Sequence, residues 1–580
     1  MGIALRTVHA LSQCCLYPRY RAFLRDKEAC GRVQHEKLIR YLRKNENTVF
    51  GREHRFSAIS SVERYRSEVP VRDYEGFEPY IERVADGQAK VLTSEEVRLL
   101  EPTGGTSSGS KLIPYTDSLR QEFQQALYPW LFDLYRNVGG LSAGRCYWSI
   151  TPVAAPRGRT SGGVPIGFED DYDYAGIAGS LLRRLECVPR QVQGIRNLEG
   201  FRYATALFLL ACADLTLISV WNPSFLLLLL DSMERHREAL IRDIRDGRIR
   251  LPEGAEEGPG PGLPAPRPSP SRARCLERLF AAPIEQRYRR IWGRLEVISC
   301  WTEGGASYHA QRLGELFPDV RIQPKGLLAT EGVVSIPLVG ARGSVPAYRS
   351  HFLEFISEDD HEPRLLDQVE NGSVYTVVLT TGGGLYRYDL KDKVRVVGRF
   401  AGLPVIEFCG RGGVSDVVGE KLEEGHVLRV IDSVLAAAGI QVGFVLFAPE
   451  VDPGGAYYTL FIEPRAGVEL APERQRQLIE AVDKGLKGNF HYKYARDIGQ
   501  LRPPGLICVE PGRGREAFLA RCAADGQRLG DIKQTVLDRR TGWTAVFCSA
   551  PRGHRATAAG QGSGQGEGRG GRGIRGGRKE

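Results

Sequence analysis

The chain has 580 residues, of which 42% are hydrophobic and 26% charged, a composition typical of an ordinary globular protein with one large and one smaller domain. Its formal net charge is +9, but residues 551–580 contain seven Lys or Arg against two Glu, so the rest carries only about +4 and indicates no particular partner. The twelve cysteines show neither zinc spacing nor a disulfide framework, which is typical of a cytoplasmic protein.

The first 90 residues alternate basic and apolar positions and predict a series of helices. Arg6 and His9 interrupt any apolar run at the N-terminus, so no signal peptide is indicated and we expect the protein to stay in the cytoplasm. Residues 204–230 are strongly apolar, but Asp214 and Asn222-Pro223 divide them into pieces shorter than the roughly 20 residues that span a bilayer. We expect a buried helix, a core strand and a second helix there, and no membrane insertion.

The strand pattern of residues 95–101 leads into a Gly/Ser/Thr-rich loop, and a short strand, LIPYT, follows it. Thr116 is expected to cap a helix that ends near Gly139-Gly140. Strands and helices alternate from there to about residue 410, interrupted by residues 251–274, whose prolines and glycines predict a flexible surface loop.

Strands are predicted at YTVVLTT, LYRYDL and KVRVVGRF, which form an antiparallel meander after residue 374. Residues 411–545 have a helix and strand pattern of their own, so the prediction is an α/β fold with a large domain over 1–410 and a smaller, mobile α+β domain over 411–545. The Gly/Arg-rich tail, 546–580, is expected to be disordered. A solvated extension is the favoured interpretation of this tail, and RNA binding is the alternative.

The loop from Thr103 to Lys111, TGGTSSGSK, combines small residues with hydroxyls and exposed N–H groups, which suits a triphosphate. It is not a Walker A loop, because Lys111 comes one place too late and no helix follows directly. The G-x-S-x-G pattern of a nucleophile elbow is matched around Ser107, but an elbow needs an immediate helix. A serine hydrolase that uses Ser107 therefore remains the alternative.

The same loop resembles the S-S-G-T-S-x-G-x-x-K signature of the Gretchen Hagen family of acyl-acid amido synthetases, within the adenylate-forming superfamily, and the residue usage indicates a bacterial-type member. The resemblance implies a large adenylate-forming domain with a smaller C-terminal domain. It also implies that the loop holds the phosphates of ATP, through Thr103, Gly105, Thr106, Ser107, Gly109 and Lys111.

Further motifs of that family follow in order. The segment from Ser299 to Leu338 resembles its W-T-G-G-S and Y-x-S-S-E-G elements, which implies that Thr330 and Glu331 meet the α-phosphate and that Glu331 is catalytic and binds Mg²⁺. Leu327 stands where the family usually has a tyrosine that stacks on adenine.

The segment GLYRYDLKDKVRVVG resembles the family's ribose-binding element and implies that Asp392 binds the ribose hydroxyls of ATP. By the same resemblance Arg411 holds phosphate or ribose, and residues 412–416 form a hinge. Lys421 is interpreted as structural, whereas Lys533 takes the place of the family's late catalytic lysine, a cation that offsets charge during attack on the α-phosphate.

Together these motifs imply a ligase that adenylates a carboxylic acid with Mg-ATP and transfers the acyl group to an amine, expected to be that of an amino acid. His309 is a candidate general base, although a histidine on a helix surface is the simpler interpretation. A non-catalytic scaffold with an RNA-binding tail is a second alternative, motivated by Leu327.

Overall fold

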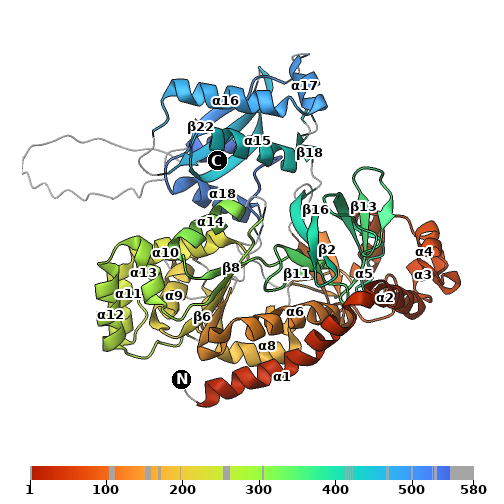
Figure 1. The fold of residues 1–580 in the computed structure, drawn as a ribbon, viewed down its shortest axis with the longest axis horizontal. Coiled ribbons are helices and arrows are strands. Elements are labelled where there is room, and N and C mark those ends of the chain that lie inside the picture. The colour runs from red at the N-terminus through yellow and green to blue at the C-terminus, as the bar shows by residue number, and fades with distance from the viewer. Residues whose placement is uncertain are drawn as a thin grey trace, which may run out of the picture.

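The computed structural model describes the following residues: 3–103, 111–149, 158–167, 171–195, 197–252, 262–303, 306–411, 414–415, 417–418, 420, 422–452, 454–465, 469–497, 501–525, 527 and 532–548. A large N-terminal domain holds the parallel and the largest antiparallel sheet, and a smaller domain, with helices α15 to α18, lies against one side of it (Figure 1). The α/β fold with a smaller C-terminal α+β domain is thus confirmed.

Five helices open the chain, as the sequence indicates, and side-chain caps fix where three of them start. They are α1 (Ile3–Arg25), α2 (Cys30–Asn45), α3 (Val49–Glu53), α4 (Val62–Glu68) and α5 (Tyr74–Ala85). The side chains of Thr48, Ser61 and Asp73 accept hydrogen bonds from the first turns of α3, α4 and α5. These oxygens satisfy N–H groups that a helix leaves unpaired at its start.

The first sheet of the large domain is parallel, with the strand order β3-β6-β7-β8. Its strands are β3 (Arg145–Trp148), β6 (Leu215–Ser219), β7 (Val297–Ser299) and β8 (Arg321–Gln323). The helices around it are α9 (Leu198–Ala211), α10 (Pro223–Arg235), α11 (Arg237–Asp246), α12 (Pro270–Phe280), α13 (Ile284–Ile291) and α14 (Ser307–Leu316). The prediction of helix, strand and helix over 204–230 is confirmed by α9, β6 and α10.

Within the described ranges, no helix combines the length and the apolar content that crossing a membrane requires. Most apolar residues of α9, β6 and α10 instead belong to one buried core, which they share with the helices around the parallel sheet. Burial of apolar surface at about 25 cal/mol per Å² makes such a core the main stabilising contribution.

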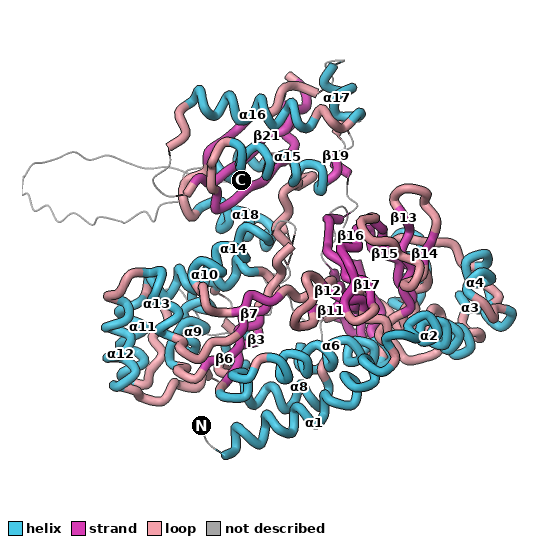
Figure 2. The backbone as a smooth tube through the Cα atoms, viewed as in Figure 1, coloured by secondary structure: helices cyan, strands magenta, loops and turns pink. Residues whose placement is uncertain are grey.

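The second sheet has seven strands in the order β11-β12-β17-β16-β15-β13-β14. Its strands are β11 (Ser335–Pro337), β12 (Ser344–Pro346), β13 (Phe352–Ser357), β14 (Pro363–Arg364), β15 (Val374–Thr380), β16 (Tyr388–Phe400) and β17 (Leu403–Arg411). Figure 2 shows them as a magenta group separate from the strands of the parallel sheet, and α6 packs against β11 of this group.

The prediction of separate strands at LYRYDL and KVRVVGRF is wrong, and the meander that is present, β15-β16-β17, takes its third strand from residues 403–411, which were not predicted as a strand. One 13-residue strand, β16, covers the second half of LYRYDL and all of KVRVVGRF. The bulges in its pairing with β15 and β17 absorb the change of register, so the strand does not need to end. Residues 385–387 precede β16, and Arg387 has a φ of 49°.

A small sheet carries the phosphate-loop candidate. Strands β1 (Leu99–Thr103) and β2 (Lys111–Tyr115) pair antiparallel, and β5 (Pro165–Ile166) and β4 (Gly158–Arg159) complete the sheet. The helix α6 (Asp117–Asn137) follows β2, and the Thr116 side chain accepts a hydrogen bond from the N–H of Leu119, as predicted. The short helices α7 (Asp171–Tyr174) and α8 (Gly176–Leu182) come next.

The smaller domain surrounds a three-stranded sheet with the order β20-β21-β22. Its elements are α15 (Glu424–Ala437), β20 (Val442–Asp452), β21 (Gly455–Pro464), α16 (Pro472–Leu486), α17 (Phe490–Asp497), β22 (Gly505–Cys508), α18 (Arg513–Ala524) and α19 (Trp543–Cys548). The pair β18 (Val414–Ser415) and β19 (Leu422–Glu423) precedes α15. Helix α19 continues this domain to Cys548, and Phe547 is buried in its core.

The expected loop over 251–274 needs a correction at its end. Helix α12 begins at Pro270, so residues 270–274 are helical. Proline is compatible with the first turn of a helix, where its missing N–H has no partner to lose. The glycine-rich residues 253–261, on which the prediction of flexibility depends, lie outside the described residues.

Candidate active site

Thr330 and Glu331 form the two-residue turn of a short hairpin between β9 (Leu328–Ala329) and β10 (Gly332–Val333). Glu331 is only 3% exposed, and its Oε1 accepts a 3.4 Å hydrogen bond from the hydroxyl of Tyr388. A Cβ added at Gly332 would approach the His351 ring to 2.7 Å, so the turn needs glycine directly after the acid. The hairpin therefore presents a buried carboxylate in a fixed position.

Asp392 lies on β16, four residues beyond Tyr388, and is 2% exposed. The register of β16 and β17 places Asp392 directly opposite Arg411, the last residue of β17. The structure therefore brings together the two positions to which the sequence assigned ribose and phosphate contacts. Tyr388 links them to Glu331, because it begins the same strand.

Lys111 lies near the same strand. It is the first residue of β2, and its ammonium lies 5.4 Å from the centre of the Tyr74 ring. The neighbouring Asp73 makes an ion pair of 3.3 Å with Lys391, the residue before Asp392. Burial alone raises the pKa of Asp73, but Lys391, together with the more weakly acting Lys111, outweighs burial and lowers it.

The rest of the loop candidate, with Gly105, Thr106, Ser107 and Gly109, lies outside the described residues, and Thr103 is described only as the end of β1. The strands on either side are informative, however, because Thr103 pairs with Lys111 in an antiparallel register. The loop thus joins two strands of a hairpin, and α6 begins only after β2. This geometry differs from the strand, turn and helix of a nucleophile elbow.

Four of the six tryptophans of the chain gather at the carboxyl ends of the parallel strands. Lys325 follows β8 and is only 2% exposed. Its ammonium donates a 2.7 Å hydrogen bond to the hydroxyl of Ser219. It lies 5.0 to 5.4 Å from the ring centres of three tryptophans, namely Trp130, Trp148 and Trp221. In open α/β sheets the carboxyl ends of the strands are where ligands bind.

Lys533 reaches this same region from the smaller domain. Its ammonium lies 5.1 Å from the centre of the Trp301 ring, and Trp301 packs against Trp221 with ring centres 5.8 Å apart. Trp301 follows β7, so the C-terminal lysine is brought to the edge of the parallel sheet. The sequence predicted Lys533 but gave no reason to pair it with the tryptophans, which lie more than 200 residues away.

His309 is buried, so the interpretation of a histidine on a helix surface is wrong. It lies on α14, is 2% exposed, and its Nε2 makes a hydrogen bond with Oε1 of Gln534. Burial, and then the positive charge of Arg515, lower the pKa of His309 to about 3. The ring is therefore neutral at physiological pH and too weakly basic to serve as a good general base.

Glu303 is an acidic residue of this region that the motifs did not single out. Its Oε2 accepts a 2.8 Å hydrogen bond from the N–H of Phe408 on β17, which ties the segment after β7 to the second sheet. Burial, opposed by the Phe408 hydrogen bond and aided more weakly by Glu407, raises the pKa of Glu303 to about 7. Near neutral pH this carboxyl group is thus partly protonated.

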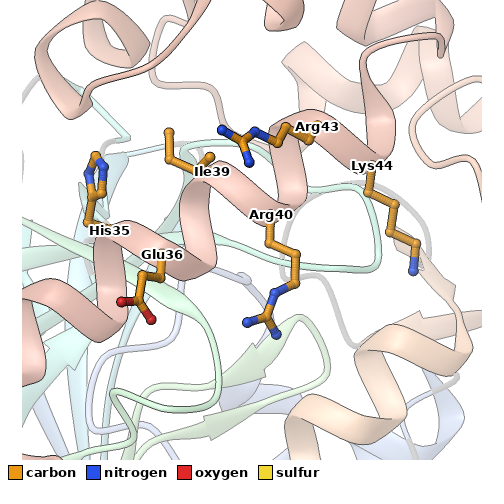
Figure 3. A pocket seen from close by; sticks show the side chains of 6 residues that line it. All are labelled: His35, Glu36, Ile39, Arg40, Arg43 and Lys44. Carbon is orange, nitrogen blue, oxygen red and sulfur yellow. The ribbon is translucent and has the colours of Figure 1, made fainter.

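For the other predicted residues the structure gives no test of the predicted role. Leu327 packs in the main core of the large domain, and its N–H donates to the hydroxyl of Ser335. Lys421 and three residues of the expected hinge, 412, 413 and 416, lie outside the described residues. A hollow on the surface of α2 contains none of the predicted site residues; His35, Glu36, Ile39, Arg40, Arg43 and Lys44 line it (Figure 3).

Comparison with family models decides the membership of the chain. The models of the GH3 family N-terminal, central and C-terminal domains match residues 19–322, 344–411 and 426–540. The chain belongs to the GH3 family. The three matches follow one another in order and include Lys111, Asp392, Arg411 and Lys533, so the family that the motifs predicted is confirmed.

Curated GH3 relatives are similar over most of their length. A protein of Oryza sativa subsp. japonica, named "Probable indole-3-acetic acid-amido synthetase GH3.12", is 25% identical, and the match covers 88% of this chain and 92% of the relative. For "Indole-3-acetic acid-amido synthetase GH3.10" of Arabidopsis thaliana the identity is 24%, with 84% and 89% covered. "Jasmonoyl--L-amino acid synthetase JAR6" of Nicotiana attenuata is 23% identical, with 66% and 70% covered.

A solved GH3 structure has the same fold. The "GH3.15 acyl acid amido synthetase" superposes with a TM-score of 0.76 at 20% identity, covering 92% of this chain and 96% of the other. A second structure of that enzyme, "in complex with 2,4-DB", gives a TM-score of 0.75 at 18% identity, with 89% and 93% covered. At these identities the similarity establishes the architecture of both domains.

Proposed function

We propose that this GH3 protein is an acid-amino acid ligase, which activates a carboxylic acid with ATP as an acyl adenylate and transfers the acyl group to an amine. The observation that carries the proposal is the meeting of three motif positions on two strands of the second sheet and the adjacent hairpin, with a fourth on β2 nearby. Glu331, Asp392 and Arg411 are linked through β16 and β17, and Lys111 acts on the charge of Asp73, as Lys391 beside Asp392 does. The family match supports the same reaction.

ATP lies along β16 in this proposal. Asp392 accepts hydrogen bonds from the two ribose hydroxyls, Arg411 holds ribose or phosphate, and the loop from Thr103 to Lys111 surrounds the β- and γ-phosphates with N–H and hydroxyl donors. Thr330 and Glu331, at the tip of the hairpin, face the α-phosphate. Each contact involves a group whose chemistry suits its part of the nucleotide.

The residues present fit a Mg²⁺ ion bound together with ATP. Glu331 offers a buried carboxylate, a hard ligand of the kind that Mg²⁺ prefers. Among the described residues no three His, Cys, Asp or Glu side chains form a metal site on their own. The ion would therefore be held by Glu331 and the phosphates, and it would neutralise charge that develops on them during adenylation.

Lys533 is the catalytic lysine of the first half-reaction. A carboxylate and an α-phosphate repel each other, and an ammonium that reaches both offsets that repulsion in the transition state. Lys533 comes from the small domain and lies at the carboxyl edge of the parallel sheet. In the second half-reaction an amine, that of an amino acid, attacks the acyl carbon and AMP leaves. No residue here is assigned as its base, since an unprotonated amine needs none.

Pyrophosphate exchange tests this function, and probe labelling and binding measurements test its alternatives. The first measurement is acid-dependent exchange of pyrophosphate into ATP over a panel that includes indole-3-acetic and jasmonic acids, the acids in the names of the relatives. Exchange that Lys533→Ala and Asp392→Ala both abolish supports the ligase. Labelling of Ser107 by a fluorophosphonate probe would instead support a hydrolase. Absence of both exchange and ATP binding would support the scaffold alternative. Loss of RNA retention on deletion of 549–580, which keeps the buried Phe547, would then test RNA binding by the tail.

A further inference from the structure

The segment that carries Lys533 is anchored to the small domain by main-chain hydrogen bonds. The N–H of Phe447 on β20 donates to the carbonyl of Val536 at 2.6 Å, and the N–H of Asp538 donates back to Phe447 at 3.0 Å. Glu424, the first residue of α15, accepts a 2.9 Å hydrogen bond from the N–H of Val536. Residues 536–538 thus extend the small-domain sheet, and Lys533 must move whenever that domain moves.

The residues on either side of Lys533 are bonded to the large domain instead. The Asn222 side chain donates a 2.8 Å hydrogen bond to the carbonyl of Ile532, and His309 bonds to the side chain of Gln534. All four residues are buried. Asn222 stands directly before α10 and His309 is on α14, two helices that pack against each other, so both bonds come from one rigid part of the large domain.

These two bonds differ from the ion pairs between the domains, among them the 3.7 Å pair of Lys393 on β16 with the half-exposed Glu423 on β19. Arg465 on the small domain makes a 3.0 Å ion pair with Glu315 on α14, but both side chains are about one third exposed. Exposed ion pairs contribute little, whereas buried hydrogen bonds are costly to lose. The bonds of Asn222 and His309 also lie within one residue of Lys533, where they fix its main chain rather than only the domain around it.

We propose that Asn222 and His309 are positioning residues that hold Lys533 at the large domain for adenylation and release it for acyl transfer. The inference depends on the proposed function, in which Lys533 serves only the first half-reaction. A contact made in one orientation of the small domain favours that orientation by its own free energy. Loss of the contact should therefore slow adenylation and leave transfer from a preformed acyl adenylate unchanged or faster.

The half-reactions can be measured separately in the full-length protein. We expect Asn222→Ala and His309→Ala each to lower acid-dependent pyrophosphate exchange about 5- to 10-fold, the effect of one buried hydrogen bond. Conversion of a preformed acyl adenylate to the amide, started with the amine, should keep the wild-type rate. Gln311→Ala, an exposed change on the same helix, is the matched control and should alter neither rate.

Two further variants separate positioning from damage to the core. Gln534→Ala together with His309→Ala should lower exchange no more than either change alone, because both remove the same bond. His309→Gln keeps a donor that can reach the Gln534 oxygen and should restore part of the exchange. Loss of both half-reactions by the same factor in a variant that retains the wild-type Tm would overturn the proposal.

A distance measurement tests the inference even if no acid supports exchange, and so distinguishes its failure from failure of the proposed function. Nitroxides can be introduced through non-natural residues at Arg274 on α12 and Gln477 on α16, which are both exposed. In the wild type we expect one dominant distance. In Asn222→Ala and His309→Ala we expect a second, separate population; an unchanged distribution in both variants would refute a role of these residues in docking.

Discussion

The hydroxyl of Tyr388 donates a hydrogen bond of 3.4 Å to Oε1 of Glu331 and so ties the tip of a two-residue turn to the start of β16. The same strand carries Asp392 opposite Arg411. A single strand thereby sets the spacing between the carboxylate proposed to hold the metal ion and the one proposed to hold the ribose.

Replacement of Glu331 by Gln should lower acid-dependent pyrophosphate exchange about 100-fold, because the amide cannot supply the negative charge that Mg²⁺ requires. The deficit should shrink when Mg²⁺ is raised, which titrations of the exchange rate at several Mg²⁺ concentrations would show. Tyr388→Phe is the matched control: it removes one neutral hydrogen bond and should cost less than about tenfold. Equal losses in the two variants would argue against a metal contact at Glu331.

Replacement of Asp392 by Asn should raise the KM for ATP about 10- to 100-fold, the effect of removing charge from one hydrogen-bond acceptor. The wild type should discriminate against 2′-deoxy-ATP, and the variant should not, because its ribose contact is already weakened. Asp389→Asn, three residues earlier on the same strand, provides the control, since Asp389 bonds to Lys391. Undiminished discrimination in Asp392→Asn would exclude the ribose assignment.

The stability of the protein should depend on the protonation of Glu303. Burial raises its pKa from 4.5 to about 7 in the folded chain. Between pH 4.5 and pH 7 the carboxyl group is therefore protonated in the folded state and ionised in the unfolded state. Stability therefore falls as pH rises from 4.5 to 7, by about 3 kcal/mol in total, and stays low above. Glu303→Gln removes this loss and should melt at a higher temperature than the wild type at pH 8.

At pH 5 the advantage of Glu303→Gln should disappear, since Glu303 is then protonated in the folded protein. Differential scanning fluorimetry at pH 5 and pH 8 measures both differences. A Tm difference of the same size at the two pH values would mean that burial does not shift the pKa of this group.

Helix α19, the last helix of the described residues, should be necessary for the stability of the small domain. Trp543 and Phe547 are buried against α18 and β20, where Trp543 stacks on Phe518 and Phe547 packs against Phe444. A chain that ends at Gly542 loses both side chains, at a cost of about 3–5 kcal/mol for each large aromatic residue. A chain that ends at Cys548 keeps them and should have the Tm of the full-length protein. An equal loss of stability in the chains that end at Gly542 and at Cys548 would contradict this role of α19.

Local sequence patterns predicted the elements that local forces determine. The cap at Thr116 and the breaks at Asp214 and Pro223 act within a few residues, and the structure has the helix and the segment boundaries that they indicate. The order of the motifs gave the family. The extent of β16 was not predictable, because it depends on bulges that form only when β15 and β17 pair with it.

The contacts around Lys533 could not be read from the sequence either. Asn222 and Ile532 are 310 positions apart, and His309 and Gln534 are 225 apart. The local sequence does not show that His309 is buried against another domain. Gln311, two residues later on the same helix, is also polar, and it is exposed. Only the docking of the small domain gives this histidine its partner.

The dual attachment of residues 532–538 has a consequence for chimeric enzymes. A small domain exchanged from a relative would bring its own lysine and its own strand pairing with β20, yet it would meet Asn222 and His309 of the recipient. Such a hybrid could fold correctly and still hold its lysine out of register with the sheet edge. Compatibility between the two halves of the chain therefore depends on the side chain at position 534 as well as on the lysine beside it.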